Sequence, residues 1–276
     1  MAVAENPIVD RYFREDNLPH IWCPGCGHGI LLRDIVMAVD SLGLDQDKVV
    51  VVSGIGCSSR GAGYVDFNTV HTTHGRAIPV ATAIKLVRPE LTVIVITGDG
   101  DCVAIGGNHF IHGARRNIDL TVVVFNNNIY GMTGGQYSPT TPTGAFGTTA
   151  PYGVIDQDFN VCKLAYAAGA TYVARGTAFH TKQTTKLIAE GIAHAGFSVI
   201  DCMSVCPTYY GRKNKQGDAV DMLTWQKENT VWHKPGEPAD VPQGKLLAGL
   251  LFQQERPEYC REYHALVERV SAAKGG

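Results

Sequence analysis

The sequence lacks the features that would mark it for a membrane, for secretion or for nucleic acid. No window of its 276 residues is long and apolar enough to span a bilayer. The N-terminal stretch 1–16 is polar and interrupted by Pro7, so it has no apolar core of a signal peptide. The 24 Lys and Arg residues do not exceed the 26 Asp and Glu residues, and the net charge is −2. We therefore expect a cytoplasmic protein that binds neither membranes nor nucleic acid.

Internal repeats and low-complexity tracts are also absent, and 45% of the residues are apolar. This composition suits one large α/β domain with its own core. The chain has eight cysteines. Because the cytosol keeps thiols reduced, they are metal ligands or small buried residues rather than a disulfide framework. We expect structural, buried roles for Cys102, Cys162, Cys202 and Cys260.

Hydrophobic patterns alternate between strand and helix along the chain. Strands are predicted at 48–53, 91–97, 120–125, 170–174 and, as the last one, 198–203; helices are predicted at 29–41, 76–87, 103–115, 158–168 and 180–195. This order predicts a doubly wound, mostly parallel sheet. Residues 131–152, rich in Gly, Thr and Pro, should form a loop beside the site. We divide the chain into an α/β domain, 1–210, and an irregular, partner-contacting C-terminal arm, 211–276, with a short helix near 257–273.

Polar residues follow two of the predicted strands where they end. Gly98-Asp99-Gly100 closes one strand, and an Asn-Asn pair ending at Asn127 closes the next. Because ligands collect at the carboxyl ends of parallel strands, Asp99 and Asn127 should lie side by side. A carboxylate, an amide oxygen and the backbone carbonyl of Ile129 suit Mg²⁺, which also takes phosphate oxygens. Glycines allow close approach, and the next helix points its amino end at the anion. The pattern predicts a magnesium-bridged diphosphate and resembles the signature of thiamine-diphosphate enzymes.

Four further cysteines form a second constellation. Cys23 and Cys26 lie in one tight turn, Cys57 follows a predicted strand, and Cys206 follows the last one. Four thiolates can hold Zn²⁺ or a [4Fe-4S] cluster. The CxxC turn alone fits a redox dithiol or half of a zinc site equally well. One close pair joined to two distant cysteines favours a cluster embedded in the fold.

Over nearly its whole length the chain resembles the thiamine-diphosphate-binding β subunit of 2-oxoacid:ferredoxin oxidoreductases. The matching motifs, in order, are WCPGCGHG, GIGCSS, HTTHGRAIPVATAIK, GDGDCVAIGGNH, NNNIYGMTGGQ and SVCPT. The resemblance implies that Cys23, Cys26, Cys57 and Cys206 ligate one [4Fe-4S] cluster close to thiamine diphosphate. It also implies that Asp99 and Asn127 ligate Mg²⁺, to which the ligand chemistry above adds the carbonyl of Ile129.

The same resemblance implies a cofactor pocket. Its residues are Ile55, Gly56, Ser58, His74, Gly75, Gly98, Gly100, Asp101, Asn127, Ile129, Gly131, Met132 and Thr133. Gly100 and Asp101 should lie against the diphosphate, and Met132 on the substrate side. The catalytic candidates are His74 and Arg60. Arg60 could pair with a second substrate carboxylate, or it could be an ordinary surface arginine.

The implied reaction is the coenzyme A-dependent oxidative decarboxylation of 2-oxoglutarate to succinyl-CoA and CO₂, or its reversal, with electrons passing through the cluster to ferredoxin. Pyruvate and branched-chain 2-oxoacids are alternative substrates. The sequence is also compatible with a non-redox thiamine-diphosphate lyase or carboligase and with a non-catalytic subunit. We find no motif for the glutamate that such enzymes direct at the aminopyrimidine. We therefore expect an α subunit to supply it, in an α2β2 heterotetramer.

Overall fold

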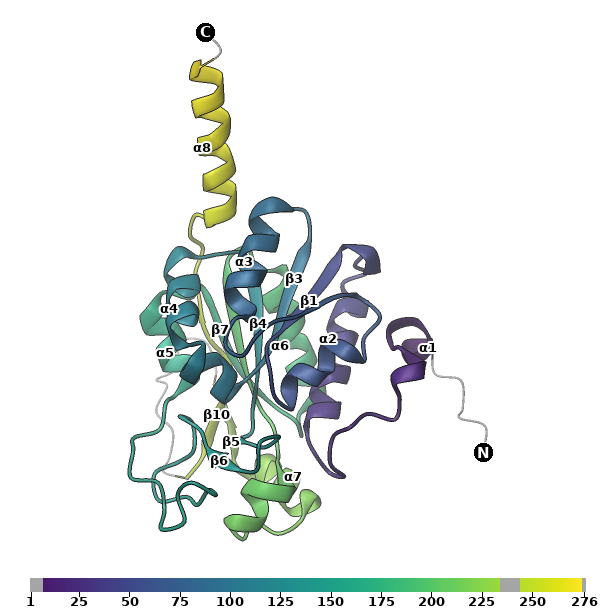
Figure 1. Cartoon of the computed structure of the whole chain (residues 1–276), viewed down its shortest axis with the longest axis vertical. Coiled ribbons are helices and arrows are strands. Elements are labelled where there is room, and N and C mark those ends of the chain that lie inside the picture. The colour runs from purple at the N-terminus through teal and green to yellow at the C-terminus, as the bar shows by residue number, and fades with distance from the viewer. Residues whose placement is uncertain (1–6, 234–243, 275–276) are drawn as a thin grey trace.

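Six parallel strands form the centre of the fold. The computed structural model describes residues 7–233 and 244–274. The sheet has the strand order β2-β1-β3-β4-β8-β7-β10-β9, in which all pairs from β2 to β7 are parallel. Strand β10 is antiparallel to β7 and parallel to β9. Helices cover both faces of the sheet (Figure 1), which confirms the predicted doubly wound, mostly parallel architecture.

The elements have the following bounds. The sheet strands are β1 (Val49–Ser53), β2 (Asn68–His71), β3 (Thr92–Gly98), β4 (Leu120–Asn126), β7 (Tyr172–Thr177), β8 (Phe197–Met203), β9 (Thr230–Trp232) and β10 (Leu246–Gln253). A separate ribbon pairs β5 (Ile129–Tyr130) with β6 (Gln136–Tyr137). The α-helices are α1 (Pro7–Tyr12), α2 (His28–Ser41), α3 (Ala77–Val87), α4 (Gly107–Arg116), α5 (Val161–Ala168), α6 (Thr181–Ala193), α7 (Ala219–Asn229) and α8 (Tyr259–Lys274). Shorter helical turns near the site are η3 (Ser58–Gly63), η4 (Gly100–Ile105) and η5 (Pro207–Gly211).

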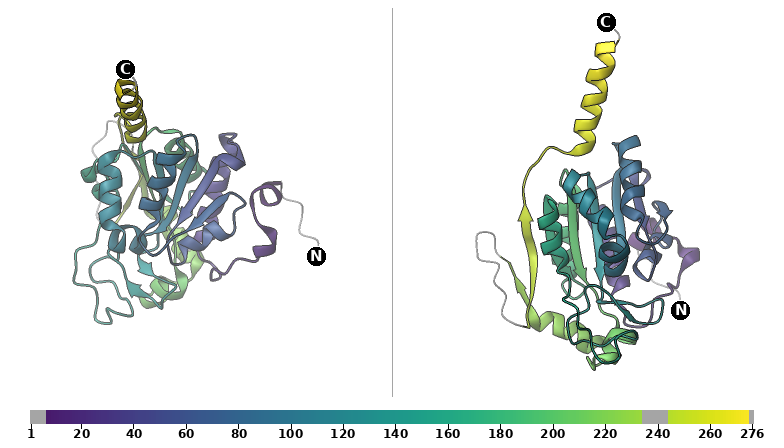
Figure 2. Two further views of the ribbon diagram at one scale, coloured as in Figure 1. Left: turned by 45° about the horizontal axis from the view of Figure 1, so that its top comes forward. Right: turned by 60° about the vertical axis from the view of Figure 1, so that its left-hand side comes forward.

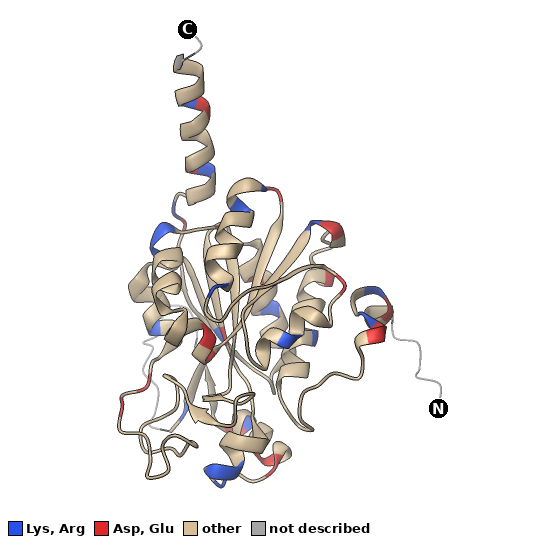
Figure 3. Ribbon diagram, in the orientation of Figure 1, with Lys and Arg blue, Asp and Glu red and all other residues tan. Residues whose placement is uncertain are grey.

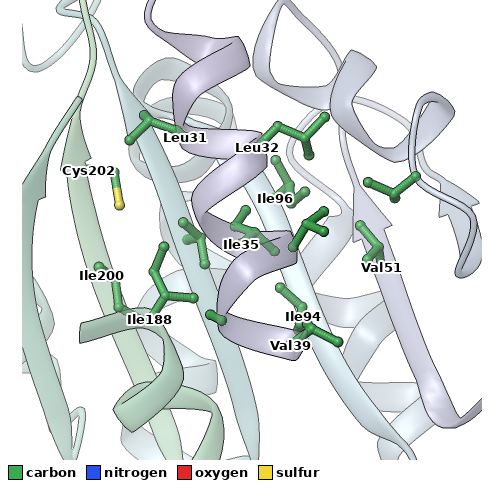
Figure 4. Close-up of a cluster of buried hydrophobic side chains, with 14 of the residues drawn as sticks. Leu31, Leu32, Ile35, Val39, Val51, Ile94, Ile96, Ile188, Ile200 and Cys202 are labelled. Carbon is green, nitrogen blue, oxygen red and sulfur yellow. The ribbon is translucent and has the colours of Figure 1, made fainter. Parts of the chain in front are cut away.

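The buried valines and isoleucines of the central strands belong to two hydrophobic cores, one on each face of the sheet. Val51 points toward α2 and α6, whereas its neighbour Val50 packs with α3, α4 and α5 on the other face. Figure 4 shows the first core, where Leu32 and Val39 of α2 lie beside Ile96 and Ile94 of β3. Strands buried on both faces read as continuous apolar runs, and this is why they could be predicted.

Several predicted boundaries needed correction. The helix predicted at 103–115 is two segments, η4 and α4, which are separated at Gly106. The strand predicted at 170–174 is displaced to Tyr172–Thr177, and the sequence prediction omitted β2, the β5–β6 ribbon and α7. None of the helices in the described ranges 7–233 and 244–274 is long and apolar enough to cross a membrane. Residues 1–6 of the polar N-terminal stretch lie outside the described part of the chain.

The C-terminal part contributes a strand that was not predicted. Strand β10 extends the sheet along β7, so 198–203 is not the last strand (Figure 2). Helix α8 begins two residues after its predicted start and projects from the end of the molecule opposite to β5 and β6 (Figure 1). Part of the predicted arm, 234–243 and 275–276, lies outside the described residues. The division of the chain at residue 210 stays a prediction.

Candidate functional site

A cavity opens at the carboxyl ends of β1, β3 and β4. Its wall is formed by His28, Ile55, Gly56, Cys57, Ser58, His74, Gly98, Asp99, Gly100, Asp101, Phe125, Asn127, Ile129, Tyr130, Gly131, Met132 and Thr133. β3 pairs with β4 in parallel, with Gly98 opposite Phe125, so the polar residues that follow both strands arrive together. The predicted convergence of Asp99 and Asn127 is therefore present in the fold.

Asp99 is a buried carboxylate held by the loop that follows β6. It is 2% exposed. The hydroxyl of Ser138 donates to Asp99 Oδ2, and the Thr140 hydroxyl lies 2.6 Å from the same oxygen. Burial raises the pKa of Asp99 to about 6, against the opposing effect of these two hydroxyls. The loop predicted at 131–152 thus folds over the end of β3 and touches the first candidate magnesium ligand.

A buried polar network continues from Asp99 into the sheet. The Thr140 hydroxyl also lies 3.1 Å from Asn126 Oδ1, and Asn126 Nδ2 donates to Asp201 Oδ1 at 3.1 Å. Arg175 Nε in turn donates to Asp201 Oδ2 at 2.9 Å, and both ionic side chains are buried. The end of β4 therefore receives support from β8 and β7. The sequence prediction missed this network because its members are spread over three strands and a loop.

Asp101 has a different role from Asp99. Its Oδ1 contacts His74 Nδ1 and accepts from Gly75 N at 2.7 Å, and its Oδ2 accepts from Thr97 Oγ1 at 2.8 Å. A methyl group added at Gly54 would lie 2.0 Å from Asp101 Oδ2, so the carboxylate also lies tightly against the end of β1. Asp101 therefore lies in the cavity wall as predicted, with its carboxylate committed to bonds within this chain.

Close packing explains one of the glycines of the strand ends. A Cβ built at Gly100 would lie 2.2 Å from the ring of Tyr130, whose hydroxyl donates to the Gly100 carbonyl at 3.2 Å. Any side chain at Gly100 would displace that ring. The cavity wall between β3 and β5 therefore requires glycine at this position.

The four predicted thiols converge beside this cavity. A Cβ built at Gly131 would lie 3.4 Å from Cys57 Sγ and 3.9 Å from Cys206 Sγ. Gly27, next to Cys26, donates its N–H to the Val205 carbonyl at 3.1 Å, which joins the CxxC turn to the end of β8. Cys26 interacts electrostatically with the other three thiols. Residues far apart in the sequence are thus brought to one place.

The environment of the thiols resists their ionisation. Burial raises the pKa of Cys26 to about 12 and that of Cys57 to about 11, with smaller contributions from the neighbouring thiols. Thiolates at this place need a compensating positive charge, which bound iron or zinc supplies. Within 7–233 and 244–274, no three His, Cys, Asp or Glu side chains already lie close enough to hold a single metal ion.

The structure does not bring every predicted residue into the cavity wall. Arg60 is exposed on η3, and Gly75 touches Asp101 without lining the cavity. Conversely, His28, Phe125 and Tyr130 line the cavity and were not predicted. His28 and Tyr130 stand within the quoted GCGHG and NNIYG motifs, so the motifs themselves were the available signal. Cys102, Cys162, Cys202 and Cys260 are all buried, as predicted.

A second, larger cavity of about 920 Å³ lies between α5, α7, β7 and β10. Its wall includes Lys163, Arg175, Trp225 and Phe252, and it contains none of the predicted site residues. Size alone would select this cavity, whereas the convergent carboxylate, amide and thiol groups select the smaller one.

The profile of the family described as "Thiamine pyrophosphate enzyme, C-terminal TPP binding domain" matches residues 54–202. The 2-oxoglutarate synthase subunit KorB of Methanothermobacter marburgensis is 51% identical to this chain, covering 98% of this chain and 95% of the relative. KorB of Methanocaldococcus jannaschii is 50% identical, with coverages of 95% and 98%. This chain belongs to the β subunits of the 2-oxoglutarate:ferredoxin oxidoreductases.

A solved structure supports the same assignment. The 2-oxoglutarate:ferredoxin oxidoreductase from Magnetococcus marinus, with 2-oxoglutarate, coenzyme A and succinyl-CoA bound, superposes with a TM-score of 0.86 at 36% identity. The match covers 95% of this β subunit and 90% of that chain. The predicted thiamine-diphosphate-binding fold is therefore confirmed. A β subunit also implies an α subunit as its partner.

Proposed function

We propose that this chain is the cofactor-binding subunit of an enzyme that oxidises 2-oxoglutarate. 2-Oxoglutarate, coenzyme A and two oxidised ferredoxins give succinyl-CoA, CO₂, one proton and two singly reduced ferredoxins; the reverse is reductive carboxylation. The observation that carries the proposal is the convergence of thiols on Gly131, in the wall of the cavity that contains Asp99 and Asn127. Decarboxylation alone needs no set of four thiols. The substrate choice rests on the relatives named for 2-oxoglutarate.

Asp99, Asn127 and the Ile129 carbonyl are our candidates for holding Mg²⁺ and, through it, the diphosphate of thiamine diphosphate. The fit is chemical: Asp99 and Asn127 are buried hard oxygen donors at adjacent strand ends, and Gly98 leaves room for a close approach. When bound, thiamine diphosphate supplies the electron sink for decarboxylation. This chain contributes the anchor for the cofactor and the packed wall behind it.

Cys23, Cys26, Cys57 and Cys206 are our candidates for holding a [4Fe-4S] cluster. Such a cluster supplies a one-electron exit at low potential. The hydrogen bond from Trp22 Nε1 to the Cys57 carbonyl, 2.7 Å, positions the segment that joins β1 to η3. The thiols therefore decide between an oxidoreductase and a simple lyase.

The substrate side of the cavity carries the remaining candidates. His74 presents Nδ1 to Asp101, which leaves its Nε2 as the nitrogen available to a substrate. Arg60, exposed on the turn that carries Ser58 into the wall, is our candidate for pairing with the second carboxylate of 2-oxoglutarate. Met132 lines the same cavity.

The α subunit is proposed to complete the site. Among the described residues, the only carboxylates in the cavity wall are Asp99 and Asp101, and each is hydrogen-bonded by this chain. The acid directed at the aminopyrimidine would then come from α, in an α2β2 heterotetramer that works in the cytoplasm with ferredoxin as acceptor.

The test replaces Cys206 by Ser in the complete complex, prepared without oxygen, with Cys202→Ala as the control. Cys202 is fully buried on β8, four residues before Cys206. We expect Cys206→Ser to lose iron and the electron paramagnetic resonance signal of the reduced cluster, while it still releases CO₂ from 2-oxoglutarate. Unaltered iron content would reject Cys206 as a ligand. A wild-type complex that contains thiamine diphosphate but no iron would favour the lyase. Faster turnover of pyruvate than of 2-oxoglutarate would reject 2-oxoglutarate as the substrate.

A further inference from the structure

A turn with three cations, Arg212, Lys213 and Lys215, connects η5 and α7, two elements that contact segments carrying candidate cluster cysteines. It begins after η5, where Gly211 N donates to the Cys206 carbonyl at 2.9 Å. It ends before α7, whose first residue packs on the CxxC turn: a methyl group added at Gly25 would lie 2.4 Å from Ala219 Cβ. The cationic turn is therefore anchored at both ends to segments that carry candidate cluster ligands.

The backbone of the cationic turn is held in place. Asn214 is the one neutral residue among the four, and it is half-buried. Its Oδ1 accepts from Phe146 N at 2.8 Å, and its Nδ2 donates to the carbonyls of Phe146 and Tyr210 at 3.1 and 2.9 Å. Lys215 completes the turn with a left-handed backbone, φ 53°. The three cations are thereby presented outward from a fixed base.

The three cations of this turn make no ion pair, within the described ranges, with the two acids that follow them in the sequence. Arg212, Lys213 and Lys215 are exposed, and no ion pair joins them to a carboxylate in the described ranges. The nearest acids in sequence, Asp218 and Asp221, accept backbone N–H groups in the capping box of α7. Figure 3 shows blue ribbon beside α7, next to a stretch of red ribbon, at the end of the molecule where β5 and β6 lie.

We propose that Arg212, Lys213 and Lys215 form the docking site for the electron acceptor, an acidic iron-sulfur protein. The inference rests on the proposed function, because it needs a cluster at the four thiols. An exposed cationic patch steers an acidic partner and raises its association rate. Docking here places the partner over the Cys23–Cys26 turn and Cys206. Each docked carrier accepts one electron and departs, so two carriers are reduced for each 2-oxoacid oxidised.

The test neutralises the patch in the complete complex as Arg212→Gln/Lys213→Gln/Lys215→Gln. Binding to a purified acidic [4Fe-4S] ferredoxin, immobilised on a sensor surface, is followed at low and high salt. We expect the association rate to fall by about tenfold or more at low salt, and the difference from wild type to shrink at high salt. Reduction of methyl viologen by 2-oxoglutarate, which needs no docked protein, should stay within about twofold of wild type.

The control variant loses the same number of positive charges at the opposite side of the molecule, near the amino ends of β1 and β4. Lys48 precedes β1, and Arg115 and Arg116 end α4 before β4. Lys48→Gln/Arg115→Gln/Arg116→Gln should leave ferredoxin association unchanged. An unchanged rate in the patch variant, an equal loss in the control, or release of the α subunit from the patch variant would each overturn the docking site. A wild-type complex that cannot reduce methyl viologen would instead count against the proposed function.

Discussion

Asp34 offers a sharp test of how burial controls ionisation in this fold. It lies on α2, facing the core beneath the sheet, and its side chain is 0% exposed. Its Oδ1 lies 3.3 Å from Arg33 Nη1, but its Oδ2 has no hydrogen-bond partner within the described ranges. Burial raises the pKa of Asp34 from 3.8 to about 7, against the opposing effects of Arg33 and of the Thr185 hydroxyl. Near neutral pH this carboxyl is therefore partly protonated.

The sign and size of the effect follow from proton linkage. Between pH 3.8 and about 7, the folded chain holds a proton that the unfolded chain has released. The free energy of unfolding should therefore fall as the pH rises through this window and level off above it. About three pH units correspond to about 4 kcal/mol at roughly 1.4 kcal/mol per unit. Asp34→Asn keeps the shape and removes the charge, so it should stabilise the protein by about 2–4 kcal/mol at pH 8.

The assay is thermal unfolding of the purified complex at pH 5, 6.5 and 8. At about 2 °C per kcal/mol, the variant should gain about 4–8 °C in Tm at pH 8 and less than half as much at pH 5. Asp47→Asn is the matched control, because Asp47 is an exposed carboxylate whose removal should not change the pH dependence. Equal gains at all three pH values, or a loss at pH 8, would refute the argument.

Three other predictions concern residues at or near the site. Arg175→Met should cost about 3–5 kcal/mol, because it leaves Asp201 as an unpaired buried charge; a change in denaturant midpoint worth less than 1 kcal/mol would contradict this. Gly100→Ala should weaken calorimetric binding of magnesium thiamine diphosphate by about tenfold or more, because a Cβ would collide with Tyr130; unaltered affinity would show that the ring yields freely. Burial lowers the pKa of His28 to about 3, so this histidine should cost stability as the pH falls below 6.5; urea unfolding of His28→Gln should show a weaker acid dependence than wild type.

The sheet, and the convergence of the strand-end polar residues and of the thiols, could be predicted because local patterns encode them. Continuous apolar runs marked β1, β3 and β4, and parallel strands bring the residues after them, Asp99 and Asn127, to one edge. Strand β10 escaped prediction because it pairs antiparallel with β7, which lies some 70 residues earlier in the chain, and borders only the short strand β9 on its other side. No local signal in the sequence points to such a pairing.

The supporting contacts of the site were beyond sequence reasoning for a related reason. The bonds from Asn126 to Asp201 and from Asp201 to Arg175 depend on the register of β4, β8 and β7. Each of these residues reads individually as an ordinary polar residue within an apolar strand. Only the assembled sheet shows that they form one network behind Asp99.

Because the four thiols are widely separated along the chain, they are synthesised at different times. The turn that contains Cys26 is synthesised early. The residue after it, Gly27, donates a hydrogen bond to the carbonyl of Val205, which lies beside Cys206 just after β8. Strand β8 inserts between β4 and β7, so the central sheet closes only when this late segment arrives. Until then a nascent chain carries three of the thiols without the fourth. A complete set of four thiols at this place is therefore available only after β8 and the segment that follows it have been made.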